Sequence, residues 1–105
     1  DPARAMLAAR VIDATAADPA VGPRVSQIDV SDAHDAVVLL DGDRALLHIG
    51  ETAFVERLRS YLTLAPTLRD RLDDIDYVDL RFDERIYVRP RNARAATPQQ
   101  ASVRY

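Results

Sequence analysis

The fold is decided by the stretch Asp76-Tyr77-Val78-Asp79-Leu80-Arg81-Phe82 and the segment that follows it, Arg85-Ile86-Tyr87-Val88-Arg89-Pro90. Apolar and polar side chains alternate in both segments, which is typical of β-strands with one buried face. The short polar connection between them predicts a terminal β-hairpin.

The register of this hairpin follows from the rule that directly opposed residues share a face of the sheet. A three-residue turn, Asp83-Glu84-Arg85, pairs Phe82 with Ile86 and Leu80 with Val88, whereas a two-residue turn would mix the two faces. The predicted core residues are therefore Val78, Leu80, Phe82, Ile86 and Val88. The residues predicted on the other face are Tyr77, Asp79, Arg81, Tyr87 and Arg89.

The second strand of the hairpin is a candidate edge strand, because no periodic segment follows Pro90. Tyr and Arg, the residue types on its polar face, are enriched at protein–protein hot spots. An extended segment of a partner could add to this edge by β-augmentation. The alternative is that Tyr87 and Arg89 are ordinary solvated residues and that the tail or Pro90 blocks the edge.

The rest of the sequence predicts further elements on the N-terminal side of the hairpin. Asp1-Pro2 opens a helix over residues 2–16, and a strand follows at 25–30. Segments 36–40 and 44–49 flank Gly42 as a second hairpin, and a helix starts at Glu51. Pro66 stops or kinks that helix, with a short second helix over 67–73. The predicted class is α+β, in the order α-β-β-β-α-β-β, with an antiparallel or mixed sheet and helices on one face. Residues 91–105 are predicted to be a basic tail.

Composition limits the possible functions. The chain has 105 residues, enough for one domain, and no Cys, which excludes thiolate catalysis, disulfides and Cys-ligated metals. The net charge is −3, which disfavours nucleic acid as a partner. Charge is uneven, since residues 1–90 carry eleven Arg against 17 acids, while 91–105 carry three Arg and no acid. No apolar run approaches the ~20 residues that span a bilayer.

The sequence shows no convincing catalytic, metal-binding or phosphate-binding site. The acidic run Asp73, Asp74, Asp76 and Asp79 resembles an EF-hand loop only superficially, because Asp79 stands where that loop requires Gly. His48 lies in a predicted strand without a nucleophile elbow or an oxyanion signature near it. The glycines are isolated, which excludes phosphate-binding loops. We therefore predict no catalytic residue, no metal and no cofactor.

Several motifs in this order resemble the β domain of the FtsQ/DivIB cell-division family. They are Leu47-His48-Ile49-Gly50, the Phe54-x-x-x-Leu58 helix running to Pro66, Ile75 to Phe82, and Ile86-Tyr87-Val88-x-Pro90. The resemblance covers residues 3–90, and its most specific part is Tyr77-Val78-Asp79-Leu80-Arg81-Phe82.

The resemblance implies a non-enzymatic protein. Members are bitopic, with a transmembrane helix and a POTRA domain before the β domain, on the outer face of the inner membrane. Neither preceding part is present in this chain, so it could not localise by itself. The β domain also usually begins with strands upstream of its first helix, and their absence would leave one sheet edge uncovered.

The resemblance also implies partners and a contact region. Family members bind FtsB and FtsL, and a segment of FtsB adds as a strand to the last strands of the β domain. Carried over to this sequence, Arg81 would meet an acidic partner residue in a bidentate contact. The implied partner-binding residues are Arg81, Phe82, Arg85, Ile86, Tyr87, Val88 and Arg89.

Two alternatives stay open at this point. The chain could be a small ligand-binding or enzymatic α+β domain with a site near His48. It could also be a POTRA-type chaperone module, but POTRA domains have the order β-α-α-β-β, which differs from the order predicted here.

Overall fold

A computed structural model of the chain describes residues 1–91 and 99–102. Its elements are α1 (Pro2–Ala16), the 3-10 turn η1 (Gly22–Arg24), β1 (Val25–Asp32), β2 (Asp35–Leu40), β3 (Leu46–Gly50), α2 (Phe54–Arg71), β4 (Ile75–Asp79), β5 (Arg85–Pro90) and β6 (Gln99–Ser102). The predicted α+β class and the order of the first seven elements are confirmed.

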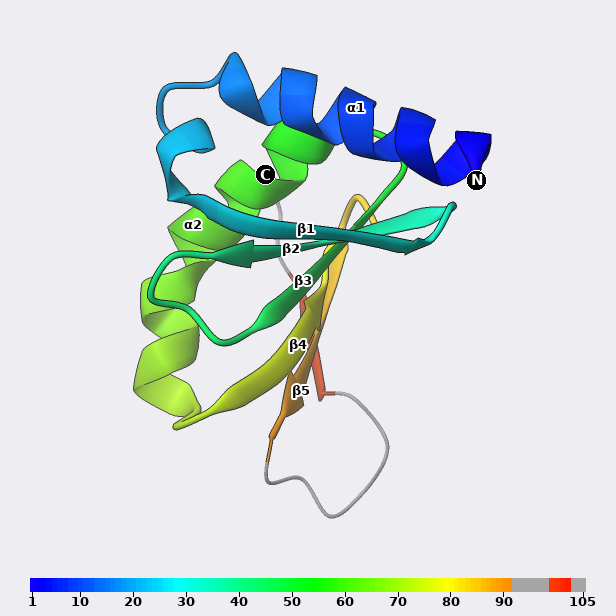
Figure 1. Cartoon of the computed structure of the whole chain (residues 1–105). Helices are drawn as coiled ribbons and strands as arrows, with labels where there is room; N and C mark the ends of the chain where they lie inside the picture. Colours follow the sequence, from blue (N-terminus) through cyan, green and yellow to red (C-terminus); the bar gives the residue numbers. More distant parts are fainter. Residues whose placement is uncertain (92–98, 103–105) are drawn as a thin grey trace.

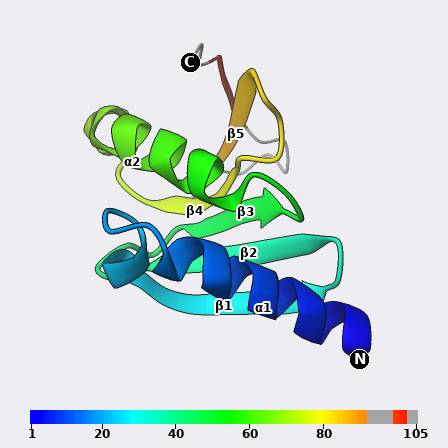
Figure 2. The same cartoon turned by 90° about the horizontal axis from the view of Figure 1, so that it is seen from above.

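The strands form one mixed sheet in sequence order, β1-β2-β3-β4-β5-β6. Neighbouring strands are antiparallel except β3 and β4, which run parallel. A parallel pair needs a crossover connection, and α2 supplies it. Figures 1 and 2 show α1 beside β1 and α2 beside β3 and β4.

One face of this sheet is the core. The registers align Val38, Leu47, Val78 and Val88 in one row across four strands, and each of these residues is almost fully buried. The two helices contact one another and pack on this face. Their buried side chains include Leu7, Val11, Phe54, Leu58, Tyr61 and Leu68.

Helix α1 begins as predicted, because the side chain of Asp1 accepts a hydrogen bond from the backbone N–H of Ala3 and Pro2 occupies the first turn. Leu7, Val11 and Thr15 follow at intervals of four residues and form its buried stripe.

Helix α2 corrects two predictions. It begins at Phe54 instead of Glu51, after Ala53 in a left-handed conformation with φ of 53°. It then continues through Pro66 to Arg71, so the separate helix predicted over 67–73 is wrong. The buried stripe resumes at Ala65 and Leu68, on either side of the exposed proline, and this packing outweighs the cost of the proline.

The register of the terminal hairpin differs from the prediction by two residues. Val88 pairs with Val78 rather than with Leu80, and residues 80–84 connect β4 to β5. β4 ends at Asp79, although the Leu80 N–H still donates to the carbonyl of His48 on β3, at 2.8 Å. A shift of two residues keeps the side chains within the two strands on their predicted faces, so Val78, Ile86 and Val88 are buried as expected, and Leu80 is buried as well.

Two further predictions are corrected at the end of the sheet. β5 is not the edge strand, because β6 pairs with it antiparallel, Tyr87 lying opposite Gln100. The predicted tail therefore contains a strand, which alternation does not reveal because Gln99-Gln100-Ala101-Ser102 has no alternating apolar residues. The remainder of that tail, 92–98 and 103–105, lies outside the described residues.

Candidate partner-binding surface on the open face of the sheet

The sheet face opposite the helices carries two rows of side chains. In the first row, Val37 pairs with His48, His48 with Asp79, and Asp79 with Tyr87. In the second, Leu46 pairs with Tyr77, and Tyr77 with Arg89. We call this surface the open face; its residues are Val37, Leu46, His48, Tyr77, Asp79, Tyr87 and Arg89.

A network of charged groups lies on the open face at the ends of β3 and β4. The side chain of Asp35 accepts from the Gly50 N–H at 3.0 Å and lies 2.7 Å from Nδ1 of His48. The Nη1 of Arg81 reaches the same carboxylate at 3.5 Å. Asp35 therefore ties β2 to β3 and to Arg81, in the connection after β4.

Arg81 is held most tightly by Asp79, two residues before it. Its Nε and Nη2 donate to the two carboxylate oxygens at 2.8 and 2.6 Å, and its backbone N–H donates at 3.1 Å. Burial would raise the pKa of Asp79, but these hydrogen bonds outweigh it and hold the pKa below its ordinary value. The same hydrogen bonds raise the pKa of Arg81.

This pairing bears on the predicted role of Arg81. The fork of its guanidinium already binds a carboxylate of its own chain, so a bidentate contact with a partner would have to displace Asp79. The Arg81 side chain is 43% exposed and lies at the surface. The contact with an acidic partner residue stays a prediction.

Phe82 corrects another prediction. It shares the parity of the core residues but is 48% exposed, because it follows the end of β4 and leaves the plane of the sheet. Its ring packs edge-on against Tyr87, with centroids 5.3 Å apart. His48 and Tyr77 make a second edge-on pair at 5.4 Å.

A cavity of about 290 Å³ opens beside Phe82, between the start of α2 and the β4–β5 connection. Arg57 lines this cavity and donates to the carbonyl of Leu80 at 3.3 Å. The cavity is lined by Ala53, Glu56, Arg57, Ser60, Leu80, Phe82 and Asp83.

The seven predicted contact residues do not share one surface. Tyr87 and Arg89 lie on the open face, and Arg81 and Phe82 lie in the connection just before β5. Ile86 and Val88 are 0% and 1% exposed and face the helices, so a partner could meet only their backbone. Arg85 is exposed at the start of β5.

Sequence reasoning missed the part that Asp35 plays, because it precedes a predicted strand and its neighbours on the open face are distant in sequence.

Within residues 1–91, no group of three or more carboxylate or imidazole side chains is arranged to hold a metal ion. Neither of the two helices described here has the combination of length and apolar character that a membrane span requires.

The chain resembles known proteins in sequence. The family model described as "Cell division protein FtsQ/DivIB, C-terminal" matches residues 4–81, from α1 to Arg81. Cell division protein FtsQ of Koribacter versatilis is 35% identical over 82 residues, which cover 75% of this chain and 24% of that protein. The chain thus spans about a quarter of the length of this relative. No solved structure matches the chain.

The family match ends at Arg81, before Phe82 and β5, so it identifies the family of the domain and does not test the predicted contact residues. It nevertheless covers well over half of the sequence, including both helices and four of the strands. This chain therefore belongs to the FtsQ/DivIB family of cell division proteins, in the C-terminal part that the family model describes.

Proposed function

We propose that this chain is a non-enzymatic scaffold module of the division machinery that binds FtsB/FtsL-type partners through its β4–β5 hairpin. It acts at the extracytoplasmic face of the inner membrane, as part of a single-pass membrane protein, and supports septum formation. Family membership and the likeness to cell division protein FtsQ of Koribacter versatilis support a role in cell division.

The observation that carries the proposal is the exposure of Phe82. A large apolar side chain that is 48% exposed gains from being covered, and aromatic residues are typical anchors of protein interfaces. Phe82 is flanked by Tyr87, whose ring packs edge-on against it, and by the cavity at the start of α2. A partner that covers Phe82 could place one apolar side chain in this cavity.

Strand addition by the partner would take place at β5. β6 already pairs with residues 85–88 of that strand, so a partner strand would have to replace β6. The backbone of Ile86 and Val88 would then contribute hydrogen bonds, while their side chains stay in the core.

The open face offers one observation in favour of a site near His48, namely its pairing with Asp35. However, that carboxylate also accepts from Gly50 and contacts Arg81, which is the arrangement of a structural network that joins strands. The scaffold function is therefore favoured over a ligand-binding or enzymatic domain.

The test is a titration of the chain with a fluorescently labelled C-terminal segment of FtsB, followed by anisotropy. Phe82→Ala should weaken binding about thirty-fold, since truncation of a hot-spot aromatic costs about 2 kcal/mol. The matched control is Met6→Ala, which removes an equally apolar side chain that is 66% exposed on α1.

Equal binding by wild type and Phe82→Ala would refute the hairpin as the contact site. Arg81→Gln is a second variant, paired with Arg71→Gln on the exposed end of α2. Circular dichroism of each variant shows whether the fold is retained, which matters for Arg81 because it is tied to Asp79.

A further inference from the structure

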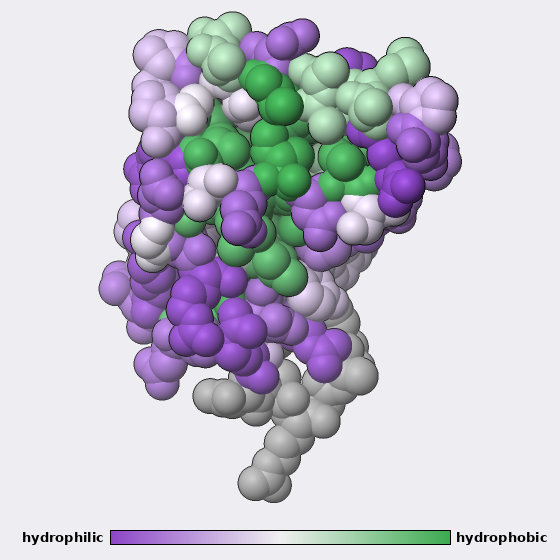
Figure 3. Space-filling model, in the orientation of Figure 1, coloured by the Kyte–Doolittle hydropathy of each residue, from purple (hydrophilic) through white to green (hydrophobic). Residues whose placement is uncertain are grey.

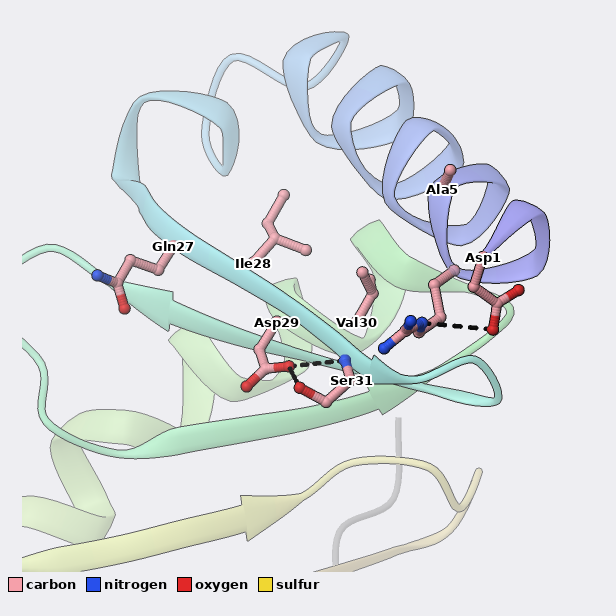
Figure 4. Close-up of a pocket in the computed structure, with 8 residues that line it drawn as sticks. Asp1, Ala5, Gln27, Ile28, Asp29, Val30 and Ser31 are labelled. Carbon is pink, nitrogen blue, oxygen red and sulfur yellow. Dashed lines mark hydrogen bonds and ion pairs between the residues drawn. The ribbon is translucent and has the colours of Figure 1, made fainter.

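The cavities of this chain differ in whether the charged side chains that line them are paired. The cavity of about 710 Å³ between α1 and β1 contains Arg4, which lies 3.3 Å from the carboxylate of Asp1. Asp29 lines the same cavity and accepts from the backbone N–H and the hydroxyl of Ser31. Figure 4 draws these contacts as dashed lines, and Figure 3 shows weakly hydrophobic residues where Figure 1 places α1. The charged side chains of this cavity therefore have partners within the chain.

A smaller cavity, of about 190 Å³, lies beside the turn between β2 and β3, and its central carboxylate is also paired. Asp43 accepts from the hydroxyl of Tyr61 and lies 3.4 Å from Nη2 of Arg69. Burial and the hydrogen bond to Asp43 raise the pKa of Tyr61. These groups form a network that joins the turn to α2, and they leave no cation without an acid beside it at this carboxylate.

The cavity of about 290 Å³ beside Phe82 differs, because its arginine lacks a close carboxylate. The Arg57 side chain is only 15% exposed. A guanidinium has several N–H donors, but Arg57 makes one hydrogen bond within residues 1–91 and 99–102, to the carbonyl of Leu80 at 3.3 Å. The nearest carboxylate in this part of the chain is that of Asp83, 3.9 Å from Nη2 and 96% exposed. A charge that is largely removed from water is costly unless it is well paired, so Arg57 can still bind an external carboxylate.

Arg81 is the arginine that the family resemblance assigns to the partner's carboxylate, but its donors are already used. It binds both oxygens of Asp79 and contacts Asp35 at 3.5 Å. Arg57 lies close to it, since a Cβ at Gly50 would be 3.3 Å from Cγ of Arg81 and 3.6 Å from Nη1 of Arg57. A partner side chain that approaches this corner therefore meets Arg57 as the guanidinium with unused donors.

The lining of the cavity defines the side chains that a partner must present. Leu80 and Phe82 supply apolar surface, and Arg57 supplies a cation whose fork matches the two oxygens of a carboxylate. Two exposed acids, Glu56 and Asp83, also line the cavity and repel an incoming carboxylate. This repulsion is screened by water and salt, whereas the contact with the largely buried Arg57 is screened less.

We propose that Arg57 binds an acidic side chain, Asp or Glu, of the partner segment that covers Phe82. This inference rests on the proposed function and names the chemistry that the partner must present, a carboxylate beside an apolar residue. Arg81 then keeps its bonds to Asp79 and Asp35 and holds the β4–β5 connection in place. Recognition at two points, apolar at Phe82 and ionic at Arg57, distinguishes this partner from apolar strands of other proteins.

The experiment extends the anisotropy titration with the labelled FtsB segment to variants of the cavity. Arg57→Gln should weaken binding about tenfold, because it removes a charge-assisted hydrogen bond from a poorly hydrated site. The matched control is Arg71→Gln, which removes an exposed arginine from the other end of α2 and should leave binding unchanged. Circular dichroism shows whether Arg57→Gln retains the fold.

Asp83→Asn supplies a second test that does not endanger the fold, because this side chain is 96% exposed. It removes the carboxylate that competes with the partner for Arg57, so the segment should bind about three times more tightly. Unchanged or weaker binding by Asp83→Asn would overturn the proposal.

The partner's acid is identified by a set of labelled segments, each with one Asp or Glu replaced by Asn or Gln. One of them should bind wild type about tenfold more weakly and yet bind Arg57→Gln as tightly as the unmodified segment does. The same cycle with Arg81→Gln should show no such coupling. Coupling to Arg81 alone, or to neither arginine, would overturn the assignment of Arg57.

These titrations separate the failure of this inference from the failure of the proposed function. If Phe82→Ala weakens binding while Arg57→Gln binds as tightly as wild type, the hairpin is the contact site and the inference about Arg57 is wrong. If Phe82→Ala also binds like wild type, or the segment does not bind at all, both the proposed function and this inference are wrong.

Discussion

The Asp79→Asn substitution tests whether the network on the open face stabilises the fold. Asp79 is 8% exposed and accepts three hydrogen bonds from Arg81. Asparagine keeps one acceptor oxygen but presents an amide to the guanidinium and removes the charge. Hydrogen bonds to charged groups contribute about 1.5–3 kcal/mol, and Arg81 recovers part of this loss by hydration. We expect the free energy of unfolding to fall by about 1–2 kcal/mol at pH 7.

The pH dependence gives this prediction a signature. The pKa of Asp79 is lower in the folded than in the unfolded chain, so its stabilisation is fully present above the unfolded pKa, about 3.9. It is lost as the pH falls through the lower, folded pKa. The difference between wild type and Asp79→Asn should therefore be constant from neutral pH to about 5 and shrink below about 4.

Urea denaturation followed by circular dichroism measures both effects. The matched control is Asp83→Asn. The Asp83 side chain is 96% exposed and comes no closer to Arg57 than 3.9 Å, so it makes a weak ion pair at most. If the two variants have the same stability at pH 7, the bond between Asp79 and Arg81 contributes nothing net. A difference that persists unchanged in acid would show that it does not arise from the charge of Asp79.

Three other predictions concern α2 and the tail. Pro66→Ala should raise the free energy of unfolding by about 2 kcal/mol in urea denaturation, because the helix gains an N–H donor and loses a ring clash. This value allows for the lower entropy that proline gives the unfolded chain. An unchanged or lower stability would contradict the prediction. Ala53→Gly should raise Tm, since glycine relieves about 1 kcal/mol of strain at φ of 53°, and Ala9→Gly on the exposed face of α1 should lower it. Removal of residues 92–105 should tighten binding of the FtsB segment by about tenfold or more, because it opens the edge of β5 that β6 occupies. An unchanged affinity would show that β6 does not compete with the partner.

Most of the fold could be predicted because its signals are local. Asp1-Pro2 marks the start of α1, and Gly42 adopts the positive φ, 74°, that its hairpin position requires. Alternation in the terminal strands gave the correct faces even though their register was wrong, since a shift of two residues preserves parity. The continuation of α2 through Pro66 depends on packing against the sheet, which no local rule contains.

The candidate site was less accessible from sequence. Alternation placed Tyr77, Arg81 and Tyr87 on one face, but it also assigned Phe82 to the core, whereas β4 ends at Asp79 and Phe82 is exposed. The contact of Arg81 with Asp79 is local, but its contact with Asp35 joins residues that are far apart in the sequence. Pairing of β6 leaves no side-chain signal at all.

The parallel contact between β3 and β4 also separates the domain into two parts whose own contacts can form independently of each other during folding. On each side of it, β1 to β3 and β4 to β5 are joined by short connections, so their contacts are local in sequence. Joining the two halves closes the long loop that contains α2, and this step contributes most to the contact order of the domain. Arg81 and Asp35 bridge the two halves on the open face. A ligand that contacts both parts on the open face would therefore stabilise the contact whose formation costs the most loop-closure entropy.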